Sequence, residues 1–148
     1  MNQPIREFAI PLPVQRSAAR SVHFSSASDE WETPSSLFGE LDRIFGGFTH
    51  DPCATPANAK CSRFFTREDD GLRQPWSGKV FMNPPYGREI GKWVKKAWSE
   101  SLTGTLVVCL LPARVDTRWW HEYARNGHVY ILRGRLKSGS SLNSAPFP

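Results

Sequence analysis

The sequence predicts an α/β fold, in which a mainly parallel sheet carries helices on its faces. Two observations predict it. Short apolar runs typical of strands alternate along the chain with segments whose apolar residues recur every three or four positions, as on one face of a helix. Polar residues directly follow two of the expected strands, as they do where parallel strands end at a ligand site. With 148 residues, the chain is long enough for a single core.

The first expected helix follows Thr33-Pro34, which predicts an N-cap hydroxyl and a proline in the first turn. Its apolar residues fall on one helical face: Leu37, Phe38, Leu41, Ile44 and Phe45. The pair Gly46-Gly47 is expected to end it. Residues 48–50 are a short strand candidate, and residues 79–82 form the next expected strand.

The second half of the chain continues the alternation. A helix is expected from the spacing of Ile90, Trp93, Val94, Ala97 and Trp98. A strongly apolar strand follows at residues 105–111. A third helix is marked by Trp119, Trp120, Tyr123 and Ala124, and residues 128–132 are expected to form a further strand.

The expected domain covers residues 29–148. Residues 1–28 mix Pro, Ser, Arg and Gln without periodicity, so we expect a disordered tail there. Prolines and charges interrupt any apolar signal-peptide region, and no segment approaches the roughly 18 apolar residues that cross a bilayer. A cytoplasmic location is the expectation.

The three cysteines, Cys53, Cys61 and Cys109, are odd in number and irregularly spaced, which favours free thiols. A zinc site formed by His50, Cys53 and Cys61 is the alternative. The chain lacks paired C-x-x-C spacing, so we expect no metal.

Nineteen Lys and Arg residues against fourteen Asp and Glu give a net charge of +5, which favours a polyanionic partner. Residues 114–137 hold six basic and two acidic side chains. A second basic group consists of Arg88, Lys92, Lys95 and Lys96. The alternative for this second group is a solvated helix face.

The most informative motif is Asn83-Pro84-Pro85-Tyr86, directly after the apolar residues 80–82. Enzymes that methylate exocyclic amines use this arrangement. The amine of adenine is a poor nucleophile, and two acceptors aimed at its N–H bonds favour a localised lone pair. The Asn83 oxygen and the Pro84 carbonyl can be these acceptors, held at fixed spacing by the rigid prolines. Tyr86 offers a flat face for a base taken out of the duplex. The alternative is a Pro-Pro turn with a buried tyrosine.

A longer series of motifs carries a resemblance to a known family. In chain order these are Trp31-x-Thr33-Pro34, Asp51-Pro52-Cys53-Ala54, Asp70-Gly71-Leu72, Trp76, Asn83-Pro84-Pro85-Tyr86-Gly87, Leu111-Pro112-x-Arg114-x-Asp116-Thr117-x-Trp119 and Gly134-Arg135. Over residues 29–136 the chain resembles the phage-type DNA N-6-adenine methyltransferases. The resemblance implies a Rossmann-like methyltransferase fold, S-adenosylmethionine as methyl donor, and adenine in double-stranded DNA as acceptor. It also implies a phage or prophage origin, a location in the cytoplasm of the bacterial host cell, and protection from host restriction.

The resemblance also implies roles for single residues. It makes Asn83, Pro84, Pro85 and Tyr86 the catalytic motif. It assigns donor binding to Thr33, Pro34, Asp51, Pro52, Cys53, Ala54, Asp70 and Asn83. Within that set, Thr33-Pro34 would contact the methionine end of the donor and Asp70 the adenosine. A plain turn residue is the alternative for Asp70. For Arg114, Asp116 and Trp119, a capped and packed helix start is the alternative to substrate contact.

Two departures from the family pattern stand out. Residues 51–59 contain no glycine, although donor-binding loops commonly use glycine for close backbone approach. Residues 138–144 form a polar run where relatives continue into an apolar strand. We therefore expect that the last strand of the sheet is missing and that a sheet edge is exposed, as in a truncated or degraded prophage copy.

Two rival functions stay open. One is an amine or amide methyltransferase that acts on protein, because the same motif serves planar amides. The other is a non-catalytic DNA-binding remnant, which would bind DNA without binding the donor. The recognition sequence and the oligomeric state cannot be predicted from these motifs.

Overall fold

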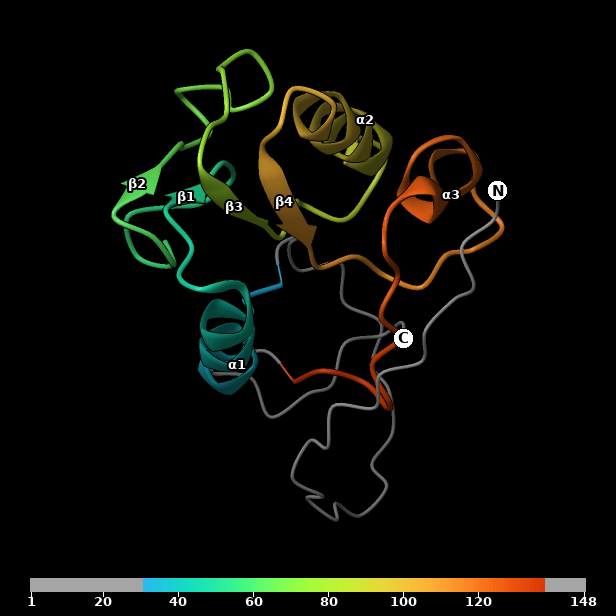
Figure 1. The fold of residues 1–148 in the computed structure, drawn as a ribbon, viewed down its shortest axis with the longest axis horizontal. Helices are drawn as coiled ribbons and strands as arrows, with labels where there is room; N and C mark the ends of the chain where they lie inside the picture. Colours follow the sequence, from blue (N-terminus) through green and yellow to red (C-terminus); the bar gives the residue numbers. More distant parts are fainter. Residues whose placement is uncertain (1–30, 138–148) are drawn as a thin grey trace.

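The structure, a computed structural model, describes residues 31–137 (Figure 1). The expected tail, the first residues of the expected domain and the polar run at 138–144 lie outside the described residues. The elements in chain order are α1 (Ser35–Phe45), β1 (His50–Asp51), β2 (Arg63–Phe64), β3 (Lys79–Met82), α2 (Ile90–Ser101), β4 (Leu106–Cys109), α3 (Arg118–Glu122) and the 3-10 helix η1 (Ala124–Asn126).

The four strands form one parallel sheet in the order β2-β1-β3-β4. The longest pairing joins β3 to β4, from Lys79 opposite Leu106 to Met82 opposite Cys109. Helices lie on both sides of the sheet (Figure 1). The predicted α/β fold with a mainly parallel sheet is therefore confirmed.

Strand β3 is the centre of the core because both of its faces are covered. Val80 and Met82 pack with Ala97 of α2 and with Trp76 on one face. Phe81 points to the other face, where its ring meets Phe38 of α1 edge-on at 5.1 Å. A continuous apolar run is what a strand buried on two faces requires, and this explains why residues 80–82 are all apolar.

Helix α1 begins one residue later than the sequence predicted. Pro34 occupies the N-cap position with φ −56° and ψ 133°, and it receives no side-chain cap. The prediction that the Thr33 hydroxyl caps this helix was wrong, because that oxygen accepts a hydrogen bond from Asn83 instead. The predicted glycine end is correct: Gly46 adopts the left-handed conformation with φ 74°.

The expected second helix is α2, which buries Ile90, Val94 and Ala97 against the sheet. The expected third helix is shorter than its apolar pattern suggested. It consists of α3 followed by η1, and Trp119 is its buried anchor.

The strand predicted at residues 128–132 was wrong, because this segment forms no strand in the described part of the chain. Its apolar side chains favour extended backbone, but a strand also needs a neighbouring edge with which to pair. The segment instead lines a cavity of about 1010 Å³ together with parts of α1 and β4.

In the sheet as described, β4 is a terminal strand and pairs only with β3. Large apolar side chains that remain well exposed gather around the same cavity: Ile44, Leu106, Val115, Tyr130 and Ile131. Within residues 31–137 these apolar side chains are thus left exposed near β4, and the missing last strand stays a prediction.

His50 of β1 is an unusual core residue. Its side chain is fully buried, and neither ring nitrogen has a hydrogen-bond partner among the described residues. The ring stands edge-on to Phe65 with 4.8 Å between centroids. The pKa of His50 is lowered to about 4, mainly by burial and also by the nearby charge of Arg63, while the charge of Glu100 partly opposes this shift. The imidazole is therefore neutral in the fold at neutral pH.

We expect the stability of the protein to fall between pH 6.5 and pH 4 because of His50. In this range the unfolded chain binds a proton at His50 and the folded chain does not, so the stability present above pH 6.5 is lost as pH falls. The loss should be roughly 2–3 kcal/mol over this interval. Urea unfolding of the wild type and of His50→Phe at pH 7 and pH 4.5 measures it.

The His50→Phe variant should lose less stability on acidification than the wild type. His121→Gln is the matched control, since His121 is exposed on α3. This variant should lose as much stability on acidification as the wild type. The buried Asp51 has a raised pKa and acts in the opposite direction, but it is present in every variant and so cancels. Equal pH dependence in the wild type and His50→Phe would contradict the assignment.

Candidate active site

The expected site residues meet at the carboxyl ends of β1 and β3, which are neighbouring parallel strands. Asp51 ends β1, and Asn83 follows β3 directly. The two loops that leave these strands touch each other, because the Cys53 thiol donates to the Asn83 carbonyl at 3.3 Å. The topology thus brings together two motifs that lie about thirty residues apart in the sequence.

The side chain of Asn83 is held by its nitrogen. Nδ2 donates to the main-chain carbonyl of Trp31 and, at 3.0 Å, to Oγ1 of Thr33. Both acceptors lie just before α1, on a segment far from Asn83 in the sequence. The two N–H hydrogens of the carboxamide are therefore both used.

The oxygen of the same carboxamide differs from the nitrogen in its surroundings. Oδ1 of Asn83 is buried and has no hydrogen-bond partner among the described residues. A main-chain carbonyl can only accept, so the Trp31 carbonyl fixes which end of the carboxamide is the nitrogen and which is the oxygen. A buried acceptor without a partner lowers the stability of the fold by about 1–3 kcal/mol. Such a group in a folded protein calls for an explanation, for example a role in catalysis.

Asp51 organises the loop that follows it. One carboxylate oxygen accepts from the Cys53 backbone N–H at 3.4 Å, and the other accepts from the Lys60 backbone N–H at 3.2 Å. Burial raises the pKa of Asp51, and these two hydrogen bonds oppose the increase. Pro52 and Ala54 are buried in the same loop. The side chain of Asp51 thus holds residues 51–60 in shape without the glycines found in many ligand loops.

The turn at Asp70 is pressed against this loop. A Cβ placed on Gly71 would lie 2.1 Å from the Pro52 carbonyl oxygen. The two backbones therefore approach so closely that only glycine fits at position 71. The Trp76 indole donates to the Gly71 carbonyl at 2.8 Å and holds the turn in place. Asp70 has a positive φ of 52°, and its half-exposed carboxylate pairs with Arg73 at 3.4 Å.

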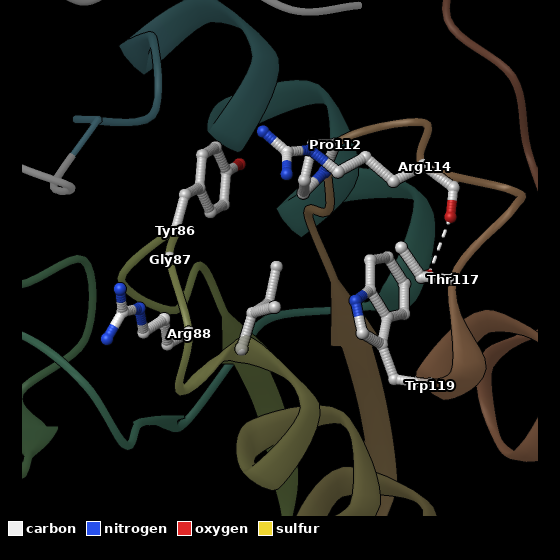
Figure 2. Close-up of a pocket in the computed structure, with 8 residues that line it drawn as sticks. Tyr86, Gly87, Arg88, Pro112, Arg114, Thr117 and Trp119 are labelled. Atoms are coloured by element: carbon white, nitrogen blue, oxygen red, sulfur yellow. Dashed lines mark hydrogen bonds between the residues drawn. The ribbon is translucent and has the colours of Figure 1, made fainter.

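Tyr86, three residues after Asn83, borders a pocket of about 250 Å³ (Figure 2). The pocket is lined by Tyr86, Gly87, Arg88, Ile90, Pro112, Arg114, Thr117 and Trp119. The aromatic rings of Tyr86 and Trp119 come from different segments and border the same space (Figure 2). The Tyr86 hydroxyl donates to the Leu110 carbonyl at 3.4 Å, and burial raises the pKa of this hydroxyl.

The two prolines of the predicted catalytic motif differ in their surroundings. Pro84 is fully buried, whereas Pro85 is half-buried. With Asn83 before them and Tyr86 after them, they form a rigid connection between the end of β3 and the pocket. The structure thus brings together the predicted catalytic motif, Thr33 and the 51–54 loop, and it places the Asp70 turn against that loop.

Two groups in this arrangement were not singled out from the sequence as site residues. They are the carbonyls of Trp31 and Leu110, which accept from Asn83 and Tyr86. A backbone carbonyl leaves no signal in a sequence, although Trp31 belongs to the Trp-x-Thr-Pro pattern.

The zinc alternative finds no support in the described residues. Between residues 31 and 137, no three His, Cys, Asp or Glu side chains gather closely enough to hold a metal ion. Burial, together with the charges of Asp51 and Asp42, raises the pKa of Cys61 to about 11, so its thiol stays protonated. Over the same residues, no helix has the length and apolar character to cross a membrane.

The sequence as a whole is similar to that of known proteins. A family model described as DNA N-6-adenine-methyltransferase (Dam) matches residues 20–143. The DNA N-6-adenine-methyltransferase of Escherichia phage T1 is 34% identical over 106 residues, which cover 70% of this chain and 44% of that protein. The enzyme of the same name from Haemophilus phage HP1 is 35% identical over 116 residues, which cover 75% of this chain and 66% of that protein.

The chain thus spans about half to two thirds of the length of these curated phage relatives. No solved structure matches it. Because the family model covers most of the chain, from the segment before Trp31 to beyond the last described residue, the chain belongs to the DNA N-6-adenine-methyltransferase (Dam) family.

Proposed function

We propose that this protein transfers a methyl group from S-adenosylmethionine to N6 of adenine in DNA. The observation that carries the proposal is the Asn83 carboxamide, whose nitrogen is fully bonded and whose buried oxygen has no partner in the described chain. The names of the phage relatives and the family support the same reaction.

The proposed chemistry needs acceptors for the two N–H bonds of the adenine amine. Asn83 Oδ1 is one acceptor, and the carbonyl of the buried Pro84 is the second. With both N–H bonds engaged, the nitrogen lone pair is directed away from the ring and toward the methyl group. Because the Asn83 carboxamide is already fixed, little reorganisation is needed in the transition state.

The pocket beside Tyr86 suits the target base. An adenine rotated out of the duplex would stack on the ring of Tyr86, and the second aromatic wall is Trp119. Arg88 and Arg114 border the same pocket and can attract the phosphates on either side of the flipped nucleotide. A net charge of +5 agrees with a DNA partner and predicts salt-sensitive binding.

The residues expected to hold the methyl donor are suitably arranged. Thr33 and the 51–54 loop both contact Asn83, and the Asp70 turn contacts Pro52. When bound, S-adenosylmethionine supplies an electrophilic methyl group. We propose that Thr33 and Pro34 lie at its methionine end, that Pro52, Cys53 and Ala54 contribute backbone, and that Asp70 contacts its ribose or adenine. Asp51 would act by shaping the loop, since both its oxygens are occupied.

The test is methyl transfer from labelled S-adenosylmethionine to unmethylated DNA, with the product nucleosides identified by mass spectrometry. We expect N6-methyladenine from the full chain, and none when the DNA is already methylated at every adenine that the enzyme can use. Label on protein rather than on DNA, or labelled cytosine, would contradict the proposal. Folded protein that binds DNA without any transfer would favour the non-catalytic remnant.

A further inference from the structure

We infer that Thr33 is a positioning residue for the acceptor chemistry: with the Trp31 carbonyl it locks the Asn83 carboxamide, so that Oδ1 alone is presented to the substrate. This inference rests on the proposed function, but it concerns contacts that exist in the free protein. The donor-binding role that the resemblance gives to Thr33 does not require these contacts.

The lock follows from a count of donors and acceptors. A carboxamide nitrogen has two hydrogens, and here each has its own acceptor, Trp31 O and Thr33 Oγ1. A half-turn of the Asn83 carboxamide would place its oxygen against the Trp31 carbonyl, and two acceptors repel each other. With Thr33 removed, one hydrogen loses its partner, and only the Trp31 contact still resists rotation.

The position of Thr33 is fixed by the core. Thr33 is only 3% exposed and directly precedes Pro34, the N-cap residue of α1. This helix is anchored by Leu37, which is fully buried, and by Phe38, whose ring meets Phe81 of β3. Phe81 lies two residues before Asn83. The helix that follows Thr33 and the strand that precedes Asn83 are therefore packed on each other, close to the hydrogen bond between these two residues.

The hydroxyl of Thr33 can also link the binding of the methyl donor to the position of the Asn83 carboxamide. Its oxygen accepts from Asn83, and its own proton remains as a donor for an anionic group such as a carboxylate. A group bound at that proton would polarise the hydroxyl and strengthen its contact with Asn83. Binding of the methyl donor at Thr33 would then hold the Asn83 carboxamide, which faces the adenine, more firmly.

Kinetics of three variants test the inference. Thr33→Val keeps the shape of the side chain and removes the hydroxyl, and Thr33→Ser keeps the hydroxyl. Thr103→Val is the matched control, because Thr103 is exposed and donates only to Glu100 at the end of α2. We expect kcat to fall about tenfold in Thr33→Val with little change in the KM for DNA, and to recover to within about threefold in Thr33→Ser.

A spectroscopic readout in the free protein separates this inference from the proposed function. The side-chain NH₂ signals of Asn83, assigned by their loss in Asn83→Ala, should shift and exchange faster with solvent in Thr33→Val, but not in Thr103→Val. If they do so and the wild type makes no N6-methyladenine, the lock stands and the proposed function fails.

Two results would overturn the inference itself. One is an Asn83 NH₂ signal that Thr33→Val leaves unchanged. The other is a Thr33→Val variant with a raised KM for S-adenosylmethionine and the kcat of the wild type, which would make Thr33 a donor-binding residue only.

Discussion

Replacing Asn83 with alanine is expected to lower the rate of methyl transfer to DNA by about 100-fold to 1,000-fold, the usual effect of removing one preorganised hydrogen-bonding group from an active site. The reason is the loss of Oδ1, the buried acceptor that has no partner within residues 31–137. Single-turnover transfer of labelled methyl groups measures the chemical step. Thermal unfolding of the same samples shows whether the fold survives.

Two further variants make the Asn83 result specific. Asn83→Asp keeps an acceptor oxygen but loses both N–H donors, so its carboxylate would face the Trp31 carbonyl and repel it. We expect this variant to be as slow as Asn83→Ala. Asn126→Ala is the control, because Asn126 is exposed on η1 and its side chain donates a hydrogen bond to the Glu122 carbonyl, away from the candidate site. A rate for Asn83→Ala within about threefold of the wild type would refute the assigned role.

The sequence predicted the central part of the fold well because β3 and α2 obey simple burial rules. Residues 80–82 are consecutive apolar residues, as a strand covered on both faces must be. In α2 the buried residues Ile90, Val94 and Ala97 recur at helical spacing. In such elements the local pattern and the tertiary environment agree, so the pattern is sufficient.

Prediction failed where pairing partners decide the structure. Strand β2 is only Arg63 and Phe64, and it exists because β1 offers an edge at that register. The segment 128–132 has a stronger strand pattern than β2, yet none of the described strands pairs with it. Strand propensity describes a residue's fit to a sheet, whereas the sheet itself is a long-range feature.

The candidate site could be located from the sequence, but the roles of its members could not all be assigned. Asp51 and Asn83 follow neighbouring strands, and this sufficed to place them together. Whether a carboxylate serves a ligand or its own loop depends on backbone N–H groups nine residues away, as at Lys60. The same holds for Thr33, whose hydroxyl was expected to cap α1 and instead contacts a residue fifty positions away.

A second large effect is expected on stability, from Gly71→Ala. The added Cβ would lie 2.1 Å from the Pro52 carbonyl oxygen and 3.2 Å from the ring of Trp93. The carbonyl is backbone held by the buried 51–54 loop, so it cannot move aside as a flexible side chain would. We expect a loss of about 3 kcal/mol in the free energy of unfolding, measured by urea denaturation, at the upper end of the usual cost of overpacking.

Gly39→Ala is the matched control for this effect, because it makes the same chemical change at a glycine with open space around it. Gly39 lies inside α1, and a Cβ there would meet no atom within 4 Å. Alanine favours the helix over glycine by about 1 kcal/mol, so this variant should be more stable than the wild type. If Gly71→Ala lost no more than about 0.5 kcal/mol, the turn at Asp70 would not be packed against Pro52, and Asp70 could not be held beside the 51–54 loop. A lower free energy of unfolding in Gly71→Ala, together with a higher one in Gly39→Ala, would show that the effect comes from close contact with Pro52 rather than from loss of glycine as such. The contact with Pro52 would then fix the turn and thereby the loop that follows β1.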